Sequence, residues 1–143
     1  MTDSSIDELS PILGRWHSTG TVRDEQGSVV AEIDGTDAYS LLPGGTWIAH
    51  EVDVRMGADR AVAHELIGGV HPEGGWWMYA FDESPAPGVM RLTRHSPDML
   101  LLSGDGIRSW FSFRAGRDLM TTEWERIVDS EWTPWMSMRF DRM

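Results

Sequence analysis

The sequence predicts an all-β protein: a single antiparallel up-and-down β-barrel of about ten strands, with a short N-terminal helical turn. Three observations lead to this prediction. Polar and apolar residues alternate with a period of two from Leu13 onward, and segments rich in Gly, Pro and Asp interrupt the alternation. No helical stretch is long enough to cross over a parallel sheet. Closure into a barrel would remove the exposed edges of such a long sheet.

The elements follow in order along one domain, residues 1–143. Ser5-Ile6-Asp7-Glu8 has the form of a capping box, which predicts a short helical plug before Pro11. A first hairpin runs out from Leu13 and returns through Val29 to Tyr39, with Trp16 placed opposite Gly35. The remaining strands are expected at 46–56, 61–70, 76–82, 88–94, 99–104, 106–115, 118–128 and 135–142.

Composition excludes several classes of function. The formal net charge of −11 disfavours nucleic acid and anionic membrane surfaces as partners. The absence of cysteine excludes thiol nucleophiles, disulfides and zinc–cysteine or iron–sulfur centres. The sequence shows neither a signal peptide nor a run that approaches a membrane span, so a cytoplasmic protein is expected.

Three short motifs resemble the calycin superfamily. They are Leu13-Gly14-Arg15-Trp16, then Leu42-Pro43-Gly44-Gly45-Thr46-Trp47, and Trp135 followed by Met138-Arg139-Phe140. Within that superfamily, the chain is similar to uncharacterised bacterial lipocalin-like barrels related to the nitrobindin-type haem proteins. The resemblance implies a ten-stranded barrel. It also implies a haem-ligating histidine late in the chain, whereas no histidine follows His95, so haem is disfavoured and no cofactor is expected.

Alternation places three ionisable side chains on the inward face of the predicted barrel: Asp37, His50 and Glu65. With four-residue loops at 42–45 and 57–60, Asp37 faces His50 directly and Glu65 lies diagonal to His50. Asp37 would orient His50 as a general acid or base, and Tyr79 or Arg94 would stabilise negative charge on a carbonyl oxygen. Alternatively, the same groups form a structural network that fixes strand register.

The other inward positions predict a pocket for a hydrophobic or amphipathic molecule. Its expected lining is Tyr39, Trp77, Phe81, Arg94, Phe111, Phe113, Trp124, Arg126 and Met138. Arg94 is expected opposite Trp77, and Arg126 is expected to close a barrel end or stack on Trp16. The remaining histidines are not spaced as a metal site, so no metal is predicted.

The leading functional prediction is a barrel that binds a small molecule without haem. The first alternative is a cofactor-independent cyclase or isomerase of natural-product biosynthesis that uses the inward acid–base group. The second alternative is a nitrobindin-like haem protein, as implied by the resemblance. Alternation also places Trp47, Trp76 and Trp110 on the outer face, where they favour a homodimer.

Overall fold

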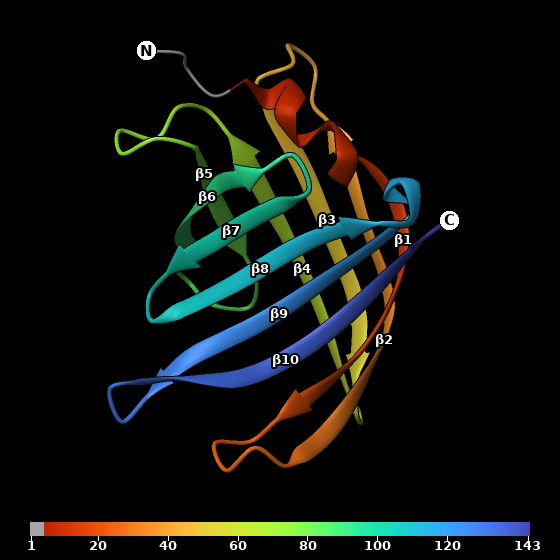
Figure 1. The fold of residues 1–143 in the computed structure, drawn as a ribbon, viewed down its shortest axis with the longest axis vertical. Coiled ribbons are helices and arrows are strands. Elements are labelled where there is room, and N and C mark those ends of the chain that lie inside the picture. Colours follow the sequence, from red (N-terminus) through yellow and green to blue (C-terminus); the bar gives the residue numbers. More distant parts are fainter. Residues whose placement is uncertain (1–4) are drawn as a thin grey trace.

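The computed structural model describes residues 5–143 and confirms the predicted antiparallel up-and-down barrel (Figure 1). Each strand pairs with its neighbours in sequence, and β1 pairs with β10 to close the barrel. The elements are η1 (Ile6–Ile12), β1 (Gly14–Arg23), β2 (Val29–Leu41), β3 (Trp47–Met56), β4 (Asp59–Gly68), β5 (Trp76–Phe81), β6 (Gly88–Ser96), β7 (Met99–Gly104), β8 (Ile107–Arg114), η2 (Ala115–Arg117), β9 (Leu119–Val128) and β10 (Glu131–Arg142). Within the described residues, no helix has the length and apolarity needed to cross a membrane.

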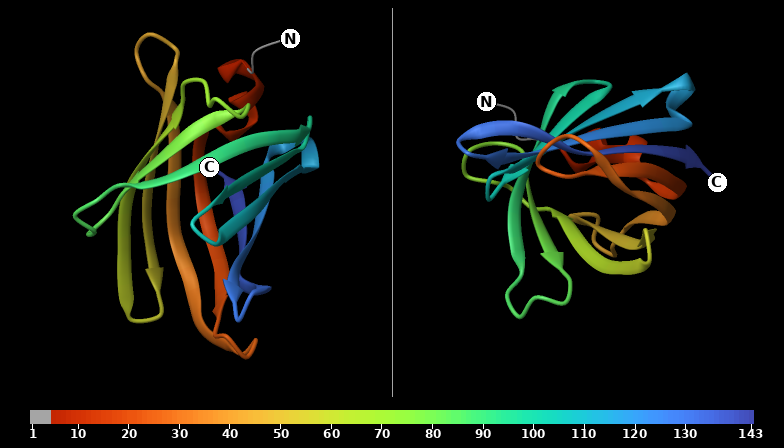
Figure 2. Two further views of the ribbon diagram at one scale, coloured as in Figure 1. Left: turned by 90° about the vertical axis from the view of Figure 1, so that its left-hand side faces the viewer. Right: turned by 90° about the horizontal axis from the view of Figure 1, so that it is seen from below.

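The predicted N-terminal helical turn is confirmed as the 3-10 helix η1. Ser5 caps it by accepting a hydrogen bond from the Asp7 N–H at 3.2 Å. Leu9 and Ile12 are buried, and the Trp16 indole donates to the Ile12 carbonyl at 2.9 Å. These contacts hold η1 across one end of the barrel, while the β1–β2, β3–β4 and β9–β10 turns lie at the opposite end (Figures 1 and 2). We call this opposite end the open end.

The predicted pairing between the first four strands is wrong by two residues in each hairpin. Tyr39, rather than Asp37, lies opposite His50, and Glu65 lies directly opposite His50. The cause is turn length: β3 and β4 are joined at Gly57 and Ala58 alone, after the Met56–Asp59 pair. A shift of two residues keeps every side chain on its predicted face. The first hairpin is displaced in the same way, so that Gly35 lies opposite Ser18 rather than Trp16.

The predicted faces of β5 are inverted. Gly68 lies opposite Trp77 and Ile67 opposite Met78, which is an odd shift from the expected register. An odd shift moves each side chain to the other face of the sheet. Trp76, Met78 and Ala80 therefore face the barrel interior, and three residues predicted inside lie outside: Trp77, Tyr79 and Phe81.

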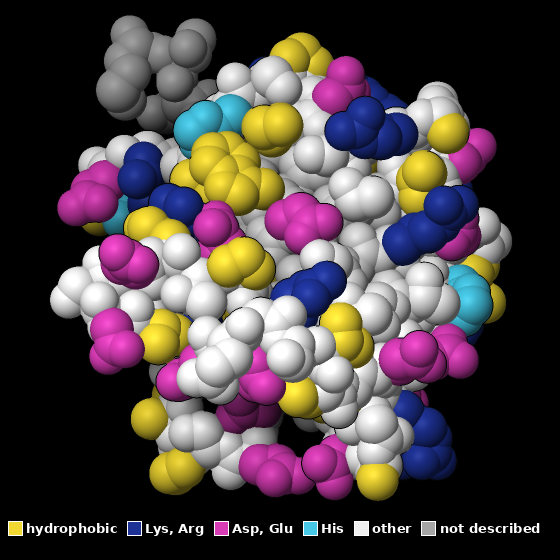
Figure 3. All heavy atoms as spheres, turned by 60° about the horizontal axis from the view of Figure 1, so that its bottom comes forward, with side chains coloured by type: hydrophobic (Ala, Val, Ile, Leu, Met, Phe, Trp, Pro, Cys, Tyr) yellow, Lys and Arg dark blue, Asp and Glu magenta, His cyan; other side chains and the backbone are white. Residues whose placement is uncertain are grey.

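The main packed core lies beside η1. The main cluster of buried side chains includes Leu9, Ile12, Trp16 and Trp76. A smaller cluster packs around Ile33, Val54 and Met136. On the β4–β6 side of the barrel, the inward positions near the open end carry small residues: Ala61, Ala63, Ala80 and Gly88. Figure 3 views this end of the molecule and shows that it is hollowed.

Candidate functional site

A histidine held between two carboxylates lies inside the barrel. Protonated His50 donates from Nε2 to Asp37 Oδ1 at 2.6 Å and from Nδ1 to Glu65 Oε1 at 2.7 Å. Asp37 also accepts a hydrogen bond from the Ser18 hydroxyl. The side chains of Asp37 and His50 are 6% and 8% exposed, whereas that of Glu65 is 19% exposed. Glu65 is thus the member of this cluster that solvent reaches most readily.

The order of the strands explains how these residues meet. β1, β2, β3 and β4 are consecutive neighbours in the barrel, and each contributes one inward side chain at about the same level: Ser18, Asp37, His50 and Glu65. Tyr39, directly opposite His50, stacks on the imidazole with a centroid distance of 3.8 Å. The Tyr39 ring therefore covers one face of the His50 imidazole. The two carboxylates accept hydrogen bonds from both imidazole nitrogens.

The surroundings of His50 favour its protonated form. Burial alone would lower the pKa of His50, but the charge of Glu65, the hydrogen bonds to Asp37 and Glu65, and the charge of Asp37 together raise it to about 9. Burial, reinforced by Asp37 and Glu65, raises the pKa of Tyr39 well above its ordinary value. At neutral pH the cluster therefore contains an imidazolium, a neutral phenol and two carboxylates, and with both carboxylates ionised its net charge is −1.

A groove lies beside β4 near the open end. β4 and β5 remain paired only as far as His64 and Phe81, so residues 59–63 of β4 have no strand on that side. A groove of about 400 Å³ lies there between β4 and the start of the β5–β6 turn. Its lining is Arg60, Ala61, Val62, Ala63, Asp82, Glu83 and Ser84. Ala61 and Ala63 belong to the inward face of β4 that also carries Glu65, so the groove borders that face.

Several of the predicted pocket residues do line the interior. Phe111 and Phe113 are buried in the main core, and Trp124 and Met138 are partly buried against it. Arg126 also lies inward, but its guanidinium is 5.2 Å from the ring centroid of Trp135, so the predicted stacking on Trp16 is wrong. Arg142 occupies that position over Trp16, at 4.1 Å.

Four other predicted site residues lie away from the cluster. Tyr79 and Trp77 are on the outer face of β5, where their ring centroids are 5.7 Å apart, and Phe81 beyond them is exposed. Arg94 lies opposite Leu100 rather than Trp77, and its guanidinium is 3.6 Å from Glu8 of η1. Neither Tyr79 nor Arg94 is therefore placed to stabilise charge beside His50.

The predicted set of site residues leaves out polar side chains on the inward face. Ser18, Ser109 and Thr122 are buried, and alternation with neighbouring core residues places all three on the inward face. Among residues 5–143, three buried polar atoms have no hydrogen-bond partner: Trp76 Nε1, Ser109 Oγ and Arg126 Nε. Buried polar atoms are normally paired, so these are positions at which a bound molecule would be stabilised.

Haem does not fit the histidines of this chain. Both nitrogens of His50 are engaged by carboxylates, and the other four histidines lie outside the barrel wall or in a turn. His17 pairs with Asp34, His71 packs on Trp77 and His95 on Trp110, while His64 is exposed. Among the described residues, no group of three potential ligands is arranged to hold a metal ion.

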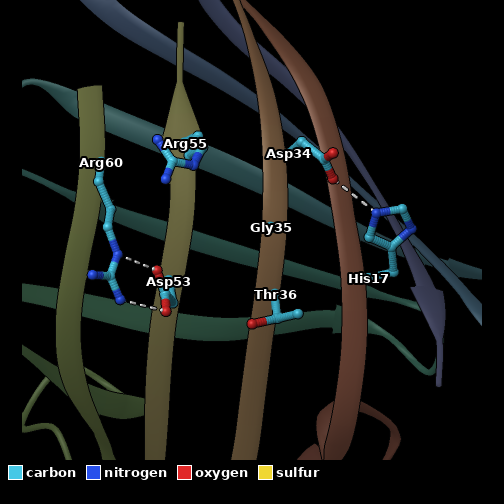
Figure 4. A pocket seen from close by; sticks show the side chains of 7 residues that line it. All are labelled: His17, Asp34, Gly35, Thr36, Asp53, Arg55 and Arg60. Carbon is cyan, nitrogen blue, oxygen red and sulfur yellow. Dashed lines mark hydrogen bonds and ion pairs between the residues drawn. The ribbon is translucent and has the colours of Figure 1, made fainter. Parts of the chain in front are cut away.

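A second groove, of about 440 Å³, lies on the outer face of β1–β4 (Figure 4). Two ion pairs cross it: His17 with Asp34 at 2.8 Å, and Arg60 with Asp53 at 2.9 Å. The four paired side chains are each more than half exposed. This groove therefore has the character of a solvated sheet surface.

Comparison with known proteins supports the fold assignment. No protein-family model and no curated protein sequence matches this chain. The structure of the S-type phycobiliprotein lyase CPES from Guillardia theta superposes with a TM-score of 0.66 at 10% sequence identity, covering 98% of this chain and 93% of that chain. A de novo designed fluorescence-activating β-barrel has a TM-score of 0.47 at 15% identity, with complete coverage of both chains. The likeness to the lyase shows a shared fold, which in this chain is a closed ten-stranded antiparallel barrel.

Proposed function

We propose that this barrel binds an amphipathic small molecule that enters at the open end and reaches Glu65. The observation that carries the proposal is the partly exposed carboxylate of Glu65 on an inward wall whose nearby β4–β6 positions toward the open end are the small residues Ala61, Ala63, Ala80 and Gly88. A wall of this kind leaves space beside an ionised group, and ligand sites combine apolar surface with a few such polar anchors. The apolar side of the ligand would face Met90 and Trp124, which are inward and partly buried.

A neutral fluorescent probe, N-phenyl-1-naphthylamine, tests the proposal. We expect its fluorescence to rise on binding to the wild-type protein, because the naphthyl ring would move from water into an apolar site. Ala63→Phe should weaken binding at least about tenfold, since a phenyl ring there would fill the interior beside Glu65. Ala38→Phe is the matched control: Ala38 lies on the outward face of β2, opposite Glu51 and outside the groove, so the same substitution there should leave affinity unchanged.

Equal probe affinity in both variants would contradict the proposal. That result would mean that the probe binds outside the barrel, for example to the outward-facing aromatic side chains Trp77 and Tyr79 of β5. Circular dichroism of both variants would verify that the barrel is intact.

A cyclase or isomerase that uses His50 receives less support from the geometry. A general acid or base needs a nitrogen that can reach the substrate, and both nitrogens of His50 are bonded to carboxylates. Of the inward predicted residues Asp37, His50 and Glu65, Glu65 has the most exposed side chain, at 19%. A catalytic role would therefore fall to Glu65. Mass spectrometry would then show that a compound incubated with the protein is converted to a product rather than retained unchanged. A nitrobindin-like haem function has no support in the donor set.

A further inference from the structure

We infer that the ligand carries a protonated amine and that Glu65 binds it. This inference rests on the proposed function and specifies the chemistry of its ligand. It starts from the charges inside the barrel. Asp37 and Glu65 bring two negative charges and His50 brings one positive charge, so one negative charge is left without a counter-charge in the cluster.

The unbalanced charge is accessible at Glu65. Asp37 is fully engaged, because one oxygen bonds His50 and the other accepts from Ser18. On Glu65, Oε1 bonds His50, and Oε2 has no hydrogen-bond partner among residues 5–143. A partly buried carboxylate oxygen that lacks a donor gains most from a charged one, because charge-assisted hydrogen bonds are about twice as strong as neutral ones.

His50 cannot provide that donor to Oε2. Its Nδ1 proton is directed at Oε1 and its Nε2 proton at Asp37, while Tyr39 covers one face of the ring. The pairing instead holds Glu65 in one orientation and keeps its second oxygen free. The cluster is thus a preorganised acceptor for one additional cation.

The groove beside β4 has the same polarity. The groove beside β4 is lined by Asp82 and Glu83, with Arg60 as its only basic residue. The whole chain carries a formal net charge of −11. Such a field attracts cations toward the groove and repels anions, which favours amines over carboxylic acids before contact is made.

Displacement of the neutral probe by three ten-carbon compounds tests the inference: decylamine, 1-decanol and decanoate. At neutral pH we expect decylamine to bind at least about tenfold more tightly than decanol, and decanoate more weakly than either. Glu65→Gln should reduce the difference between decylamine and decanol to less than about twofold. Glu51→Gln removes the same charge from the exposed outer face of β3 and should preserve the preference for amine.

The outcomes separate this inference from the proposed function. If the probe and decanol bind inside the barrel but decylamine has no advantage in the wild-type protein, the inference is wrong and the proposed function stands. An amine preference that survives Glu65→Gln also overturns it, because the amine is then bound elsewhere. If the neutral probe does not bind the wild-type protein at all, the proposed function and the inference both fail. The wild-type series decides the question even if Glu65→Gln does not fold.

Discussion

At the scale of single residues, His50 links stability to pH. Its pKa is about 9 in the folded protein, compared with 6.5 for an unperturbed histidine. The native state therefore binds this proton more tightly than the unfolded state does. The resulting stabilisation is fully present below about pH 6.5 and is lost as the pH rises through 9.

We predict that the free energy of unfolding falls by up to about 3 kcal/mol between pH 6.5 and pH 9, because one pKa unit corresponds to about 1.4 kcal/mol. Urea denaturation at several pH values across this range measures the free energy of unfolding. The range ends below the region where Tyr39 ionises in the unfolded chain, so Tyr39 does not contribute to the change. His64→Gln, on the exposed face of β4, should retain the fall, whereas His50→Gln should largely abolish it. A flat profile in the wild-type protein would show that His50 is neutral when folded.

At the scale of elements, glycine allows the strands to approach one another closely. Gly35 lies on the inward face of β2 two residues from Asp37, opposite Val54 of β3. A Cβ atom at Gly35 would overlap the carbonyl oxygen of Asp53 and the Cα of Val54. These are backbone atoms, so the overlap would be relieved only by moving β2 away from β3.

Gly35→Ala should therefore lower the free energy of unfolding by about 3 kcal/mol, at the upper end of overpacking effects. Gly88→Ala is the matched control, since the new Cβ would lie 3.6 Å from that of Ala80, an ordinary contact. Its effect should stay below about 0.5 kcal/mol. Thermal or urea unfolding measures the stability of the two variants. Equal stabilities would show that β2 and β3 can move apart at Gly35 at little cost in free energy.

At the scale of the whole molecule, the inversion of β5 places an aromatic surface on the outside of the barrel. We call Trp47, Trp77, Tyr79 and Phe81 the outer aromatic face. Trp47 and Trp77 both lie near Tyr79, with ring centroids 6.0 and 5.7 Å away, and Phe81 is 46% exposed. The homodimer expected from outward tryptophans remains a prediction, and its contact residues change: Trp76 is buried inside the barrel.

We expect the outer aromatic face to support weak self-association that strengthens with salt, because screening reduces the repulsion between copies of net charge −11. Sedimentation velocity at low and high salt measures it. Trp77→Ser should reduce association, whereas Trp132→Ser, at a distant exposed position beside Arg108, should not. A monomer at every concentration and salt level would rule the dimer out.

The difference between β5 and the other strands shows how far the sequence could predict the site. In β2 and β3, polar and apolar residues alternate, so an error of two residues left Asp37, Tyr39 and His50 on their correct face. In β5, Trp76 to Phe81 is a continuous apolar run that gives no signal for either face. The preceding Gly68 and Gly69 have positive φ. The β4–β5 register therefore depends on the conformation of this turn and not only on the number of residues in it.

The sequence by itself determined the all-β barrel, the helical plug and the inward position of Asp37, His50 and Glu65, because alternation and turn chemistry are local properties. Only the tertiary structure decided which carboxylate lies directly opposite His50, that Ser18 completes the bonding of Asp37, and that Tyr79 faces outward. It also decided which end is closed by η1 and where β4 and β5 separate. These features depend on register and on packing between strands distant in sequence, which the pattern of one strand does not contain.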